Sequence, residues 1–193
     1  MIRNIMKVDS LKLLQSLKGQ KLKFTTGAGL TQNLMTDVFA VVTDCQVLTL
    51  EGKLEIIDLP ENEEEMSSFE INGIGATKTS EIVEANTHFF YFKGEPVKDI
   101  FITRERISCF TAGFKNWDYL SDVGIMIELP SGFISVYRRT HYDEVLSAIF
   151  TRTRPELGDT TTDSLFESTL IAEYQVTRTE FPLDELINEV SLD

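Results

Sequence analysis

Apolar and polar residues alternate most clearly in residues 124–137, on both sides of a break at residues 130–132. Ile125, Ile127 and Leu129 fall on one face of an extended strand, because strand side chains point to alternate sides. The break has the sequence Pro-Ser-Gly, in which proline cannot donate a ladder hydrogen bond and glycine accepts a positive φ angle. Strand formers resume directly after it, so this segment predicts a β-hairpin.

The same alternation predicts extended strands through most of the chain before this hairpin. Two further hairpins are expected, each with a short turn that contains glycine. The predicted strand pairs are residues 46–50 with 53–59, joined at residues 51–52, and residues 87–93 with 97–107, joined at residues 94–96. Further strands are expected at residues 21–26, 34–43 and 69–79, the last with an Asn-Gly turn, and polar loops at residues 60–65 and 113–122.

A period of 3.6 residues predicts helices near both ends of the chain. Three leucines share one stripe of a short helix over residues 10–18, with Asp9 as its cap and Gly19 as its stop. Residues 141–152 predict another helix, because their apolar residues also recur with this period. The last helix begins at Pro182, since proline suits the first helical position.

These elements predict an α+β fold dominated by β-structure. We expect an antiparallel meander of about seven to nine strands, forming a curled sheet, a barrel or a sandwich, with a short N-terminal helix and one to three helices in the C-terminal third. Residues 165–176 fit either a helix or a strand. The length suits one domain, with a β-rich core over residues 1–152, a polar linker over residues 153–164, and an acidic segment over residues 165–193 that packs on the core.

The formal net charge of −13 narrows the range of partners. Residues 51–92 contain two basic and ten acidic residues, and residues 155–193 contain one basic and ten acidic residues. A negative field disfavours nucleic acids and anionic membranes and steers basic proteins toward the surface. Solubility alone is the plainer explanation. A cytoplasmic protein is expected, because no export signal is visible and no apolar run approaches the about 20 residues that span a bilayer.

Candidate catalytic and metal-binding chemistry is sparse. Cys45 and Cys109 lie among strand formers, where each is expected to be a small buried hydrophobe. Two Cys and two His at these spacings match no zinc-ligand pattern, and the motifs of serine hydrolases, zinc proteases and phosphate-binding loops do not occur. We therefore expect no cofactor and no metal, and the sequence disfavours an enzyme.

The cluster that most resembles an active site is Arg138, Arg139 and His141, directly after the predicted hairpin. Arginine pairs hold phosphate or carboxylate groups, and histidine titrates near neutrality. Internal ion pairs with the acidic segments are the plainer explanation. The two strands of a hairpin meet again at the end opposite the turn, so we expect residues 117–123 and 138–142 to lie close together.

Phe114, Trp117 and Tyr119 place three aromatic rings in the predicted loop at residues 113–122. Aromatic anchors with a polar rim are typical of protein-binding hot spots, whereas the alternative is a loop pinned to its own core by these rings. The predicted partner-binding residues are these three aromatics and the acidic residues Glu63, Glu64, Glu65, Asp184, Glu185 and Glu189.

The sequence thus favours a non-enzymatic acidic binding or inhibitor protein, similar in profile to immunity proteins and phage inhibitors. Its expected partner is a basic macromolecule such as a nucleic-acid enzyme or a toxin. Two alternatives stay open. One is a small-ligand module or enzyme with a pocket near Arg138, Arg139 and His141. The other is an interaction subunit of a larger assembly, in which the C-terminal helix docks outside the domain. The oligomeric state is open.

Overall fold

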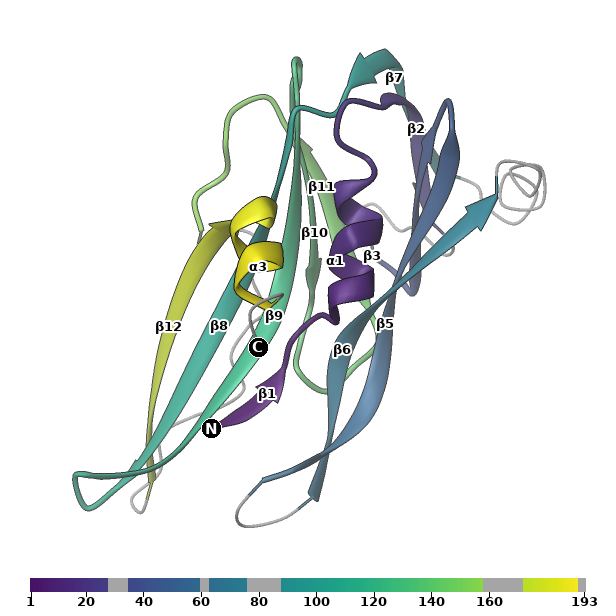
Figure 1. Cartoon of the computed structure of the whole chain (residues 1–193). Coiled ribbons are helices and arrows are strands. Elements are labelled where there is room, and N and C mark those ends of the chain that lie inside the picture. The colour runs from purple at the N-terminus through teal and green to yellow at the C-terminus, as the bar shows by residue number, and fades with distance from the viewer. Residues whose placement is uncertain (28–34, 60–62, 76–87, 158–171, 191–193) are drawn as a thin grey trace.

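Two β-sheets dominate the protein in the computed structural model, which describes residues 1–27, 35–59, 63–75, 88–157 and 172–190 (Figure 1). The seven-stranded sheet has the order β12 (Ala172–Pro182), β8 (Asp99–Thr111), β9 (Phe114–Leu129), β10 (Gly132–Arg138), β11 (Leu146–Thr151) and β3 (Met35–Thr36), and β1 (Ile2–Asn4) pairs with β9. The five-stranded sheet has the order β6 (Glu63–Gly75), β5 (Gln46–Asp58), β4 (Val38–Thr43), β2 (Lys21–Gly27) and β7 (His88–Pro96). Apart from the parallel β1–β9 pair, the pairings of the described strands are antiparallel, which confirms the predicted β-dominated fold.

The hydrophobic core joins both sheets and both helices. Helix α1 (Val8–Gln15) contributes Leu11 and Leu14, and helix α3 (Leu183–Val190) contributes Leu183 and Leu186, all fully buried. The helices are also linked through Lys18, whose Nζ lies 2.6 Å from Asp184 Oδ2. No helix in the described part of the chain is long and apolar enough to cross a membrane.

The hairpin at residues 124–137 is confirmed. Strands β9 and β10 pair from Leu129 with Gly132 to Gly124 with Tyr137, so the turn falls at the Pro-Ser-Gly break. Gly132 has a φ of +153° and lies against β11, where an added Cβ would be 2.1 Å from the carbonyl oxygen of Thr151. Glycine is therefore required here both by the turn and by the neighbouring strand.

The predicted turn at residues 51–52 is wrong, because β5 continues through it. Gly52 pairs with Phe69 of β6, and a Cβ at Gly52 would lie 2.0 Å from the carbonyl oxygen of Glu144. Glycine at this position accommodates a close backbone approach and does not form a turn. The predicted Asn-Gly turn at residues 72–73 is wrong for a related reason, since both residues pair with β5 inside β6.

The predicted hairpin at residues 87–107 is also wrong, since its two strands belong to different sheets. Strand β7 pairs with β2, whereas β8 pairs with β9 and β12. Gly94, with a φ of +74°, lies inside β7 at an irregularity in its pairing with β2, just before the segment that crosses between the sheets. Val97 anchors this crossing, because its backbone N–H donates to the carbonyl of Gln20 over 3.0 Å.

Residues 113–122 are not a loop but the first half of β9. The hairpin that sequence reasoning missed joins β8 to β9 through Ala112 and Gly113, whose φ angles are +50° and +80°. Two consecutive residues with positive φ are typical of tight hairpin turns. Polar residues interleaved with the aromatic rings hid the strand, because only one face of it is buried.

The predicted helix at residues 141–152 is wrong as well. Residues 146–151 form β11, paired with β10. The residues just before it make local turns: Thr140 Oγ1 accepts from the N–H of Tyr142, and Asp143 Oδ1 accepts from the N–H of Val145. These side chains offer the backbone an alternative to helical hydrogen bonds.

The helices predicted at the two ends of the chain are confirmed, with shifted limits: Pro182 ends β12 and α3 begins at Leu183, and the N-cap of α1 is Lys7 and not Asp9. Helix α1 begins at Val8 and places Asp9 in its first turn, and Gly19 has the positive φ expected of a helix stop. In the predicted acidic loop at residues 60–65, residues 63–65 belong to β6 and residues 60–62 lie outside the described residues. Residues 165–171 lie outside them too, and β12 begins at Ala172.

Candidate functional site

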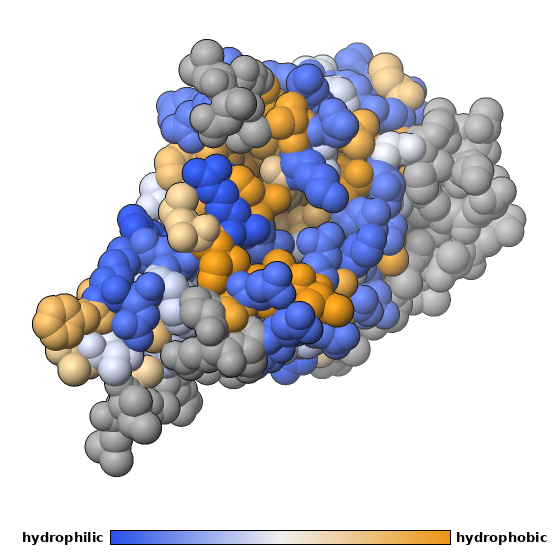
Figure 2. Space-filling model, turned by 60° about the horizontal axis from the view of Figure 1, so that its bottom comes forward, coloured by the Kyte–Doolittle hydropathy of each residue, from blue (hydrophilic) through white to orange (hydrophobic). Residues whose placement is uncertain are grey.

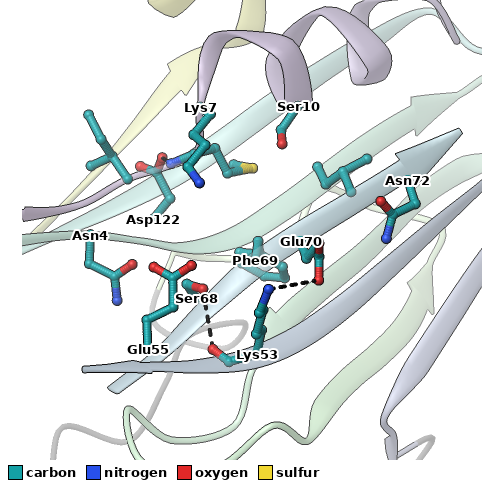
Figure 3. A pocket seen from close by; sticks show the side chains of 13 residues that line it. Asn4, Lys7, Ser10, Lys53, Glu55, Ser68, Phe69, Glu70, Asn72 and Asp122 are labelled. Atoms are coloured by element: carbon teal, nitrogen blue, oxygen red, sulfur yellow. Dashed lines mark hydrogen bonds and ion pairs between the residues drawn. The ribbon is translucent and has the colours of Figure 1, made fainter. Parts of the chain in front are cut away.

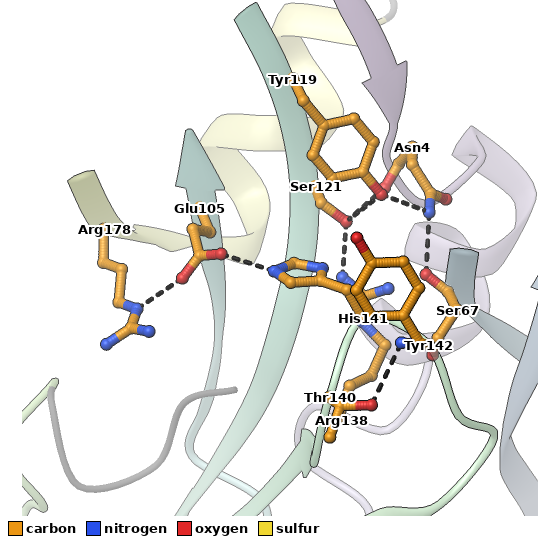
Figure 4. A network of polar contacts seen from close by, with 10 residues as sticks. All are labelled: Asn4, Ser67, Glu105, Tyr119, Ser121, Arg138, Thr140, His141, Tyr142 and Arg178. Carbon is orange, nitrogen blue, oxygen red and sulfur yellow. Dashed lines mark hydrogen bonds and ion pairs between the residues drawn. The ribbon is translucent and has the colours of Figure 1, made fainter. Parts of the chain in front are cut away.

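A buried polar network lies where β8, β9 and β10 meet the connection from β10 to β11 (Figure 4). As predicted, residues 117–123 and 138–142 lie close together: Arg138 Nη2 is 2.5 Å from Ser121 Oγ, and the rings of Tyr119 and His141 are 5.9 Å apart. The network is built around side chains that are fully buried, namely Glu105, Tyr119, Ser121, Arg138 and His141.

Glu105 is the centre of charge in this network. His141 Nε2 lies 2.7 Å from Glu105 Oε1, and Arg178 Nε donates to Glu105 Oε2 over 2.6 Å. Burial opposes ionisation, but the contacts with His141 and Arg178 outweigh it and lower the pKa of Glu105. Burial lowers the pKa of His141, so near neutral pH an uncharged imidazole donates its Nε2–H to an ionised carboxylate.

A second branch of the network connects the two sheets. Asn4 Nδ2 donates to Tyr119 Oη and to the backbone carbonyl of Ser67 in β6, both over 2.8 Å. The guanidinium of Arg138 lies over the ring of Phe69, also in β6, with 5.8 Å between its Cζ and the ring centroid. Burial lowers the pKa of the Arg138 guanidinium, which is what isolation from water does to a cation.

The connection from β10 to β11 fastens the β5–β6 ribbon to the first sheet. The backbone carbonyl of His141 accepts from the N–H of Ser67 over 2.6 Å, and the carbonyl of Glu144 packs on Gly52. Arg138 and His141 are therefore engaged inside the fold. Arg139 is exposed, with Nη1 3.3 Å from Met35 Sδ. This arrangement gives no support to a ligand pocket formed by these three residues.

Two of the three predicted aromatic anchors are core residues. Tyr119 is fully buried and Trp117 is 8% exposed, and both belong to a second apolar cluster together with Met66, Ile107 and Cys109. Neither ring is presented to a partner, because β9 turns both toward the interior. Cys109 is buried as expected, whereas the expectation for Cys45 is wrong, since it is exposed.

Phe114, the third predicted aromatic anchor, lies beside the β8–β9 turn with 78% of its surface exposed. The charged residues behind it largely neutralise one another: Asp118 lies 2.5 Å from Arg106 and 2.7 Å from Lys115. The guanidinium of Arg106 contributes most to holding the pKa of Asp118 far below its usual value. The protruding feature of this hairpin is therefore its apolar ring.

The acidic residues of β6 lie at the far end of the β5–β6 ribbon. Glu63 pairs with Asp58, and Glu65 pairs with Ile56, so these four side chains share one face of the ribbon and all are exposed. Ile56 is 66% exposed, which is unusual for a strand isoleucine. Glu64 is half-buried on the other face, beside Ile57, which packs on the second apolar cluster.

The β5–β6 ribbon and the β8–β9 hairpin, which carries Phe114, end on the same side of the molecule, at the bottom of Figure 1. We call this the docking end and define it by Ile56, Asp58, Glu63, Glu65 and Phe114. With this side turned forward, Figure 2 shows apolar residues exposed among hydrophilic ones.

The acidic residues of α3 lie away from this end (Figure 1). Glu185 and Glu189 are exposed, whereas Asp184 binds Lys18 and Gln15, contacts that lower its pKa. The apolar face of α3 is used inside the domain, because Leu183 and Leu186 are fully buried. That packing does not favour a helix that docks outside the domain.

A polar pocket of about 140 Å³ lies between β1, the start of α1 and the β5–β6 ribbon (Figure 3). Its walls carry Lys7 and Lys53 and the carboxylates of Glu55, Glu70 and Asp122. The described residues contain no group of three or more His, Cys, Asp or Glu placed to hold a metal ion. Comparisons with protein-family models, curated proteins and solved structures found no match for this chain.

Proposed function

We propose that this protein is a non-enzymatic binding protein that docks on a basic macromolecular partner through its docking end. The observation that carries this proposal is that Ile56 and Phe114 are exposed apolar residues on two hairpins, β5–β6 and β8–β9, that end on the same side of the molecule (Figure 1). Apolar side chains exposed to water cost free energy in proportion to their apolar surface area. A bound partner removes that cost.

The charge around one anchor indicates the kind of partner. Ile56 is flanked on its face by Asp58, Glu63 and Glu65, and none of these four residues carries a positive charge. A carboxylate rim around an apolar anchor attracts a positively charged surface and repels a negatively charged one. A basic groove on a nucleic-acid enzyme or a toxin has the required charge, and an inhibitor or immunity role follows from covering it.

The interior of the protein supports this use of the ribbon. Contacts from His141 and Glu144 to Ser67 and Gly52 hold the β5–β6 ribbon against the first sheet. A rigid ribbon loses little conformational entropy when it binds, so more of the contact energy appears as affinity. We therefore assign the buried network a supporting role and the docking end the binding role.

Association kinetics test the electrostatic part of the proposal. A partner recovered from the native cell is bound to the immobilised protein at several salt concentrations, and the on-rate is measured. We expect the on-rate to fall by about tenfold or more between low salt and about 0.15 M, because the Debye length shrinks to about 8 Å. The double variant Glu63→Gln/Glu65→Gln should flatten this dependence, and Glu185→Gln/Glu189→Gln on α3 is the matched control. An on-rate that does not change with salt concentration contradicts electrostatic steering by the docking end.

A further inference from the structure

We propose that the polar pocket beside α1 binds a small zwitterion of the α-amino-acid class. The pocket lies beside α1 and is lined by Glu55, the neighbour of Ile56 on β5 (Figure 3). Neighbouring strand residues point to opposite faces, so the pocket and the docking end use opposite faces of the ribbon, and the proposal does not depend on the macromolecular partner. Its lining comes from the β1–α1 connection on one side, from β5 and β6 on the other, and from Asp122 of β9.

Most charged groups of the pocket already have partners in the protein. Asp122 accepts hydrogen bonds from Arg104 Nε over 2.7 Å and from the backbone N–H of Met6 over 2.8 Å. Lys53 Nζ lies 3.6 Å from Glu70 Oε2. These contacts neutralise two of the three carboxylates and one of the two ammonium groups.

Lys7 and Glu55 are left with unmatched charge. The described part of the chain supplies an ion-pair partner to neither of them. In Figure 3 the Lys7 ammonium points into the pocket from the β1–α1 connection, and the Glu55 carboxylate points into it from β5. The pocket therefore offers one cation and one anion on facing walls. An α-amino acid carries the complementary pair, a carboxylate for Lys7 and an ammonium for Glu55.

The polar lining and the size of the pocket fit the same class of ligand. Ser10 and Asn72 add uncharged donors and acceptors. A volume of about 140 Å³ suits a ligand of few non-hydrogen atoms and is below the range of about 300–1,000 Å³ typical of larger cofactors and drug-sized molecules. A simple anion would leave Glu55 unmatched, and a simple cation would leave Lys7 unmatched.

The walls are fixed before any ligand arrives. The Met6–Asp122 hydrogen bond holds the β1–α1 connection, and Ser68 Oγ donates to the backbone carbonyl of Lys53 over 3.2 Å. A pocket whose walls are already ordered binds a small molecule with little reorganisation.

Titration of the ¹⁵N-labelled full chain, followed by NMR, tests the proposal. The probes are glycine, alanine, serine and glutamate. Acetate, which carries only the carboxylate, and methylamine, which carries only the ammonium group, are the control ligands. We expect amide shifts at Lys7, Ser10 and Ser68 with at least one amino acid, at concentrations up to about 10 mM, and an affinity at least about tenfold above that for either half. Glu55→Gln and Lys7→Met should each weaken this binding by about tenfold or more.

Two control variants separate this site from general charge effects. Glu65→Gln lies on the opposite face of the same ribbon and Lys12→Met on the exposed face of α1, and neither should alter the titration. Urea unfolding checks that each variant is folded. If Glu55→Gln does not fold, the titration of Lys7→Met tests the site. No shift with any of the four amino acids overturns the proposal. Equal binding of acetate or methylamine alone also overturns it, because the site would then recognise a single charge.

Discussion

Replacing Glu105 by Gln probes the buried network that links the two sheets. Glu105 is fully buried and contacts His141 at 2.7 Å and Arg178 at 2.6 Å. Removing one partner of a buried ion pair costs about 3–5 kcal/mol, because the remaining charge stays desolvated. The amide of Gln still accepts a hydrogen bond from Arg178, whose side chain is 25% exposed to compensating water. We therefore expect the free energy of unfolding to fall by about 3 kcal/mol, near the lower limit of that range.

Urea and thermal unfolding monitored by circular dichroism measure this loss. For a chain of this size, each kcal/mol lowers Tm by about 2–4 °C, so Glu105→Gln should melt roughly 6–12 °C below the wild type. Glu173→Gln changes an exposed carboxylate on β12 and serves as the matched control, with an unchanged Tm expected. A Glu105→Gln variant as stable as this control would refute the view that the contacts of Glu105 with His141 and Arg178 stabilise the fold.

Three further outcomes follow from the same structure. Trp117→Ala should cost about 3–5 kcal/mol in urea unfolding, whereas Phe114→Ser should leave the midpoint unchanged, since only the first ring is buried. The free energy of unfolding should fall as pH drops below about 6.5, because burial lowers the pKa of His141 and the unfolded chain therefore takes up the proton first. The variant His141→Asn should show a weaker dependence of this free energy on pH between pH 7 and pH 5. Gly52→Ala should destabilise by about 1–3 kcal/mol and speed hydrogen exchange at the Ser67 amide, because its Cβ would strike Glu144; unchanged exchange would contradict that contact.

Local sequence patterns were sufficient to predict an element where the contacts that determine it lie within the same segment. The hairpin at residues 124–137 depends on alternation and on a Pro-Ser-Gly turn, and both lie within the segment itself. The terminal helices depend on leucine stripes that are again contained in the helix. In contrast, Gly52 looks like a turn residue, and only its contact with Glu144, distant in the chain, explains why the strand continues.

The buried network left a weaker signal in the sequence. Glu105 alternates with Ile107 and Cys109, which are both buried, so it occupies an inward position of β8. A carboxylate in such a row indicates a buried charge that needs partners. Its partners His141 and Arg178 could not be assigned, because they come from segments 36 and 73 residues away.

The docking end was only partly predictable. Glu63 and Glu65 were recognised from the acidic run, and Phe114 from the aromatic segment. Trp117 and Tyr119 were not separated from Phe114, because the strand that turns them inward was not recognised. Ile56 was missed, since an isoleucine in a strand is normally buried and its exposure depends on how the ribbon projects.

Quantitative capture from the native cell with matched variants tests the docking end most directly. Wild type, the anchor variant Ile56→Asp/Phe114→Asp and the control variant Glu185→Lys/Glu189→Lys are immobilised at equal density, and retained proteins are measured by mass spectrometry. Both anchors are exposed, so the anchor variant should stay folded. We predict a basic protein that the wild type and the control retain and that the anchor variant loses by about tenfold or more. Equal retention by the anchor variant would contradict the assignment of this end as the binding surface.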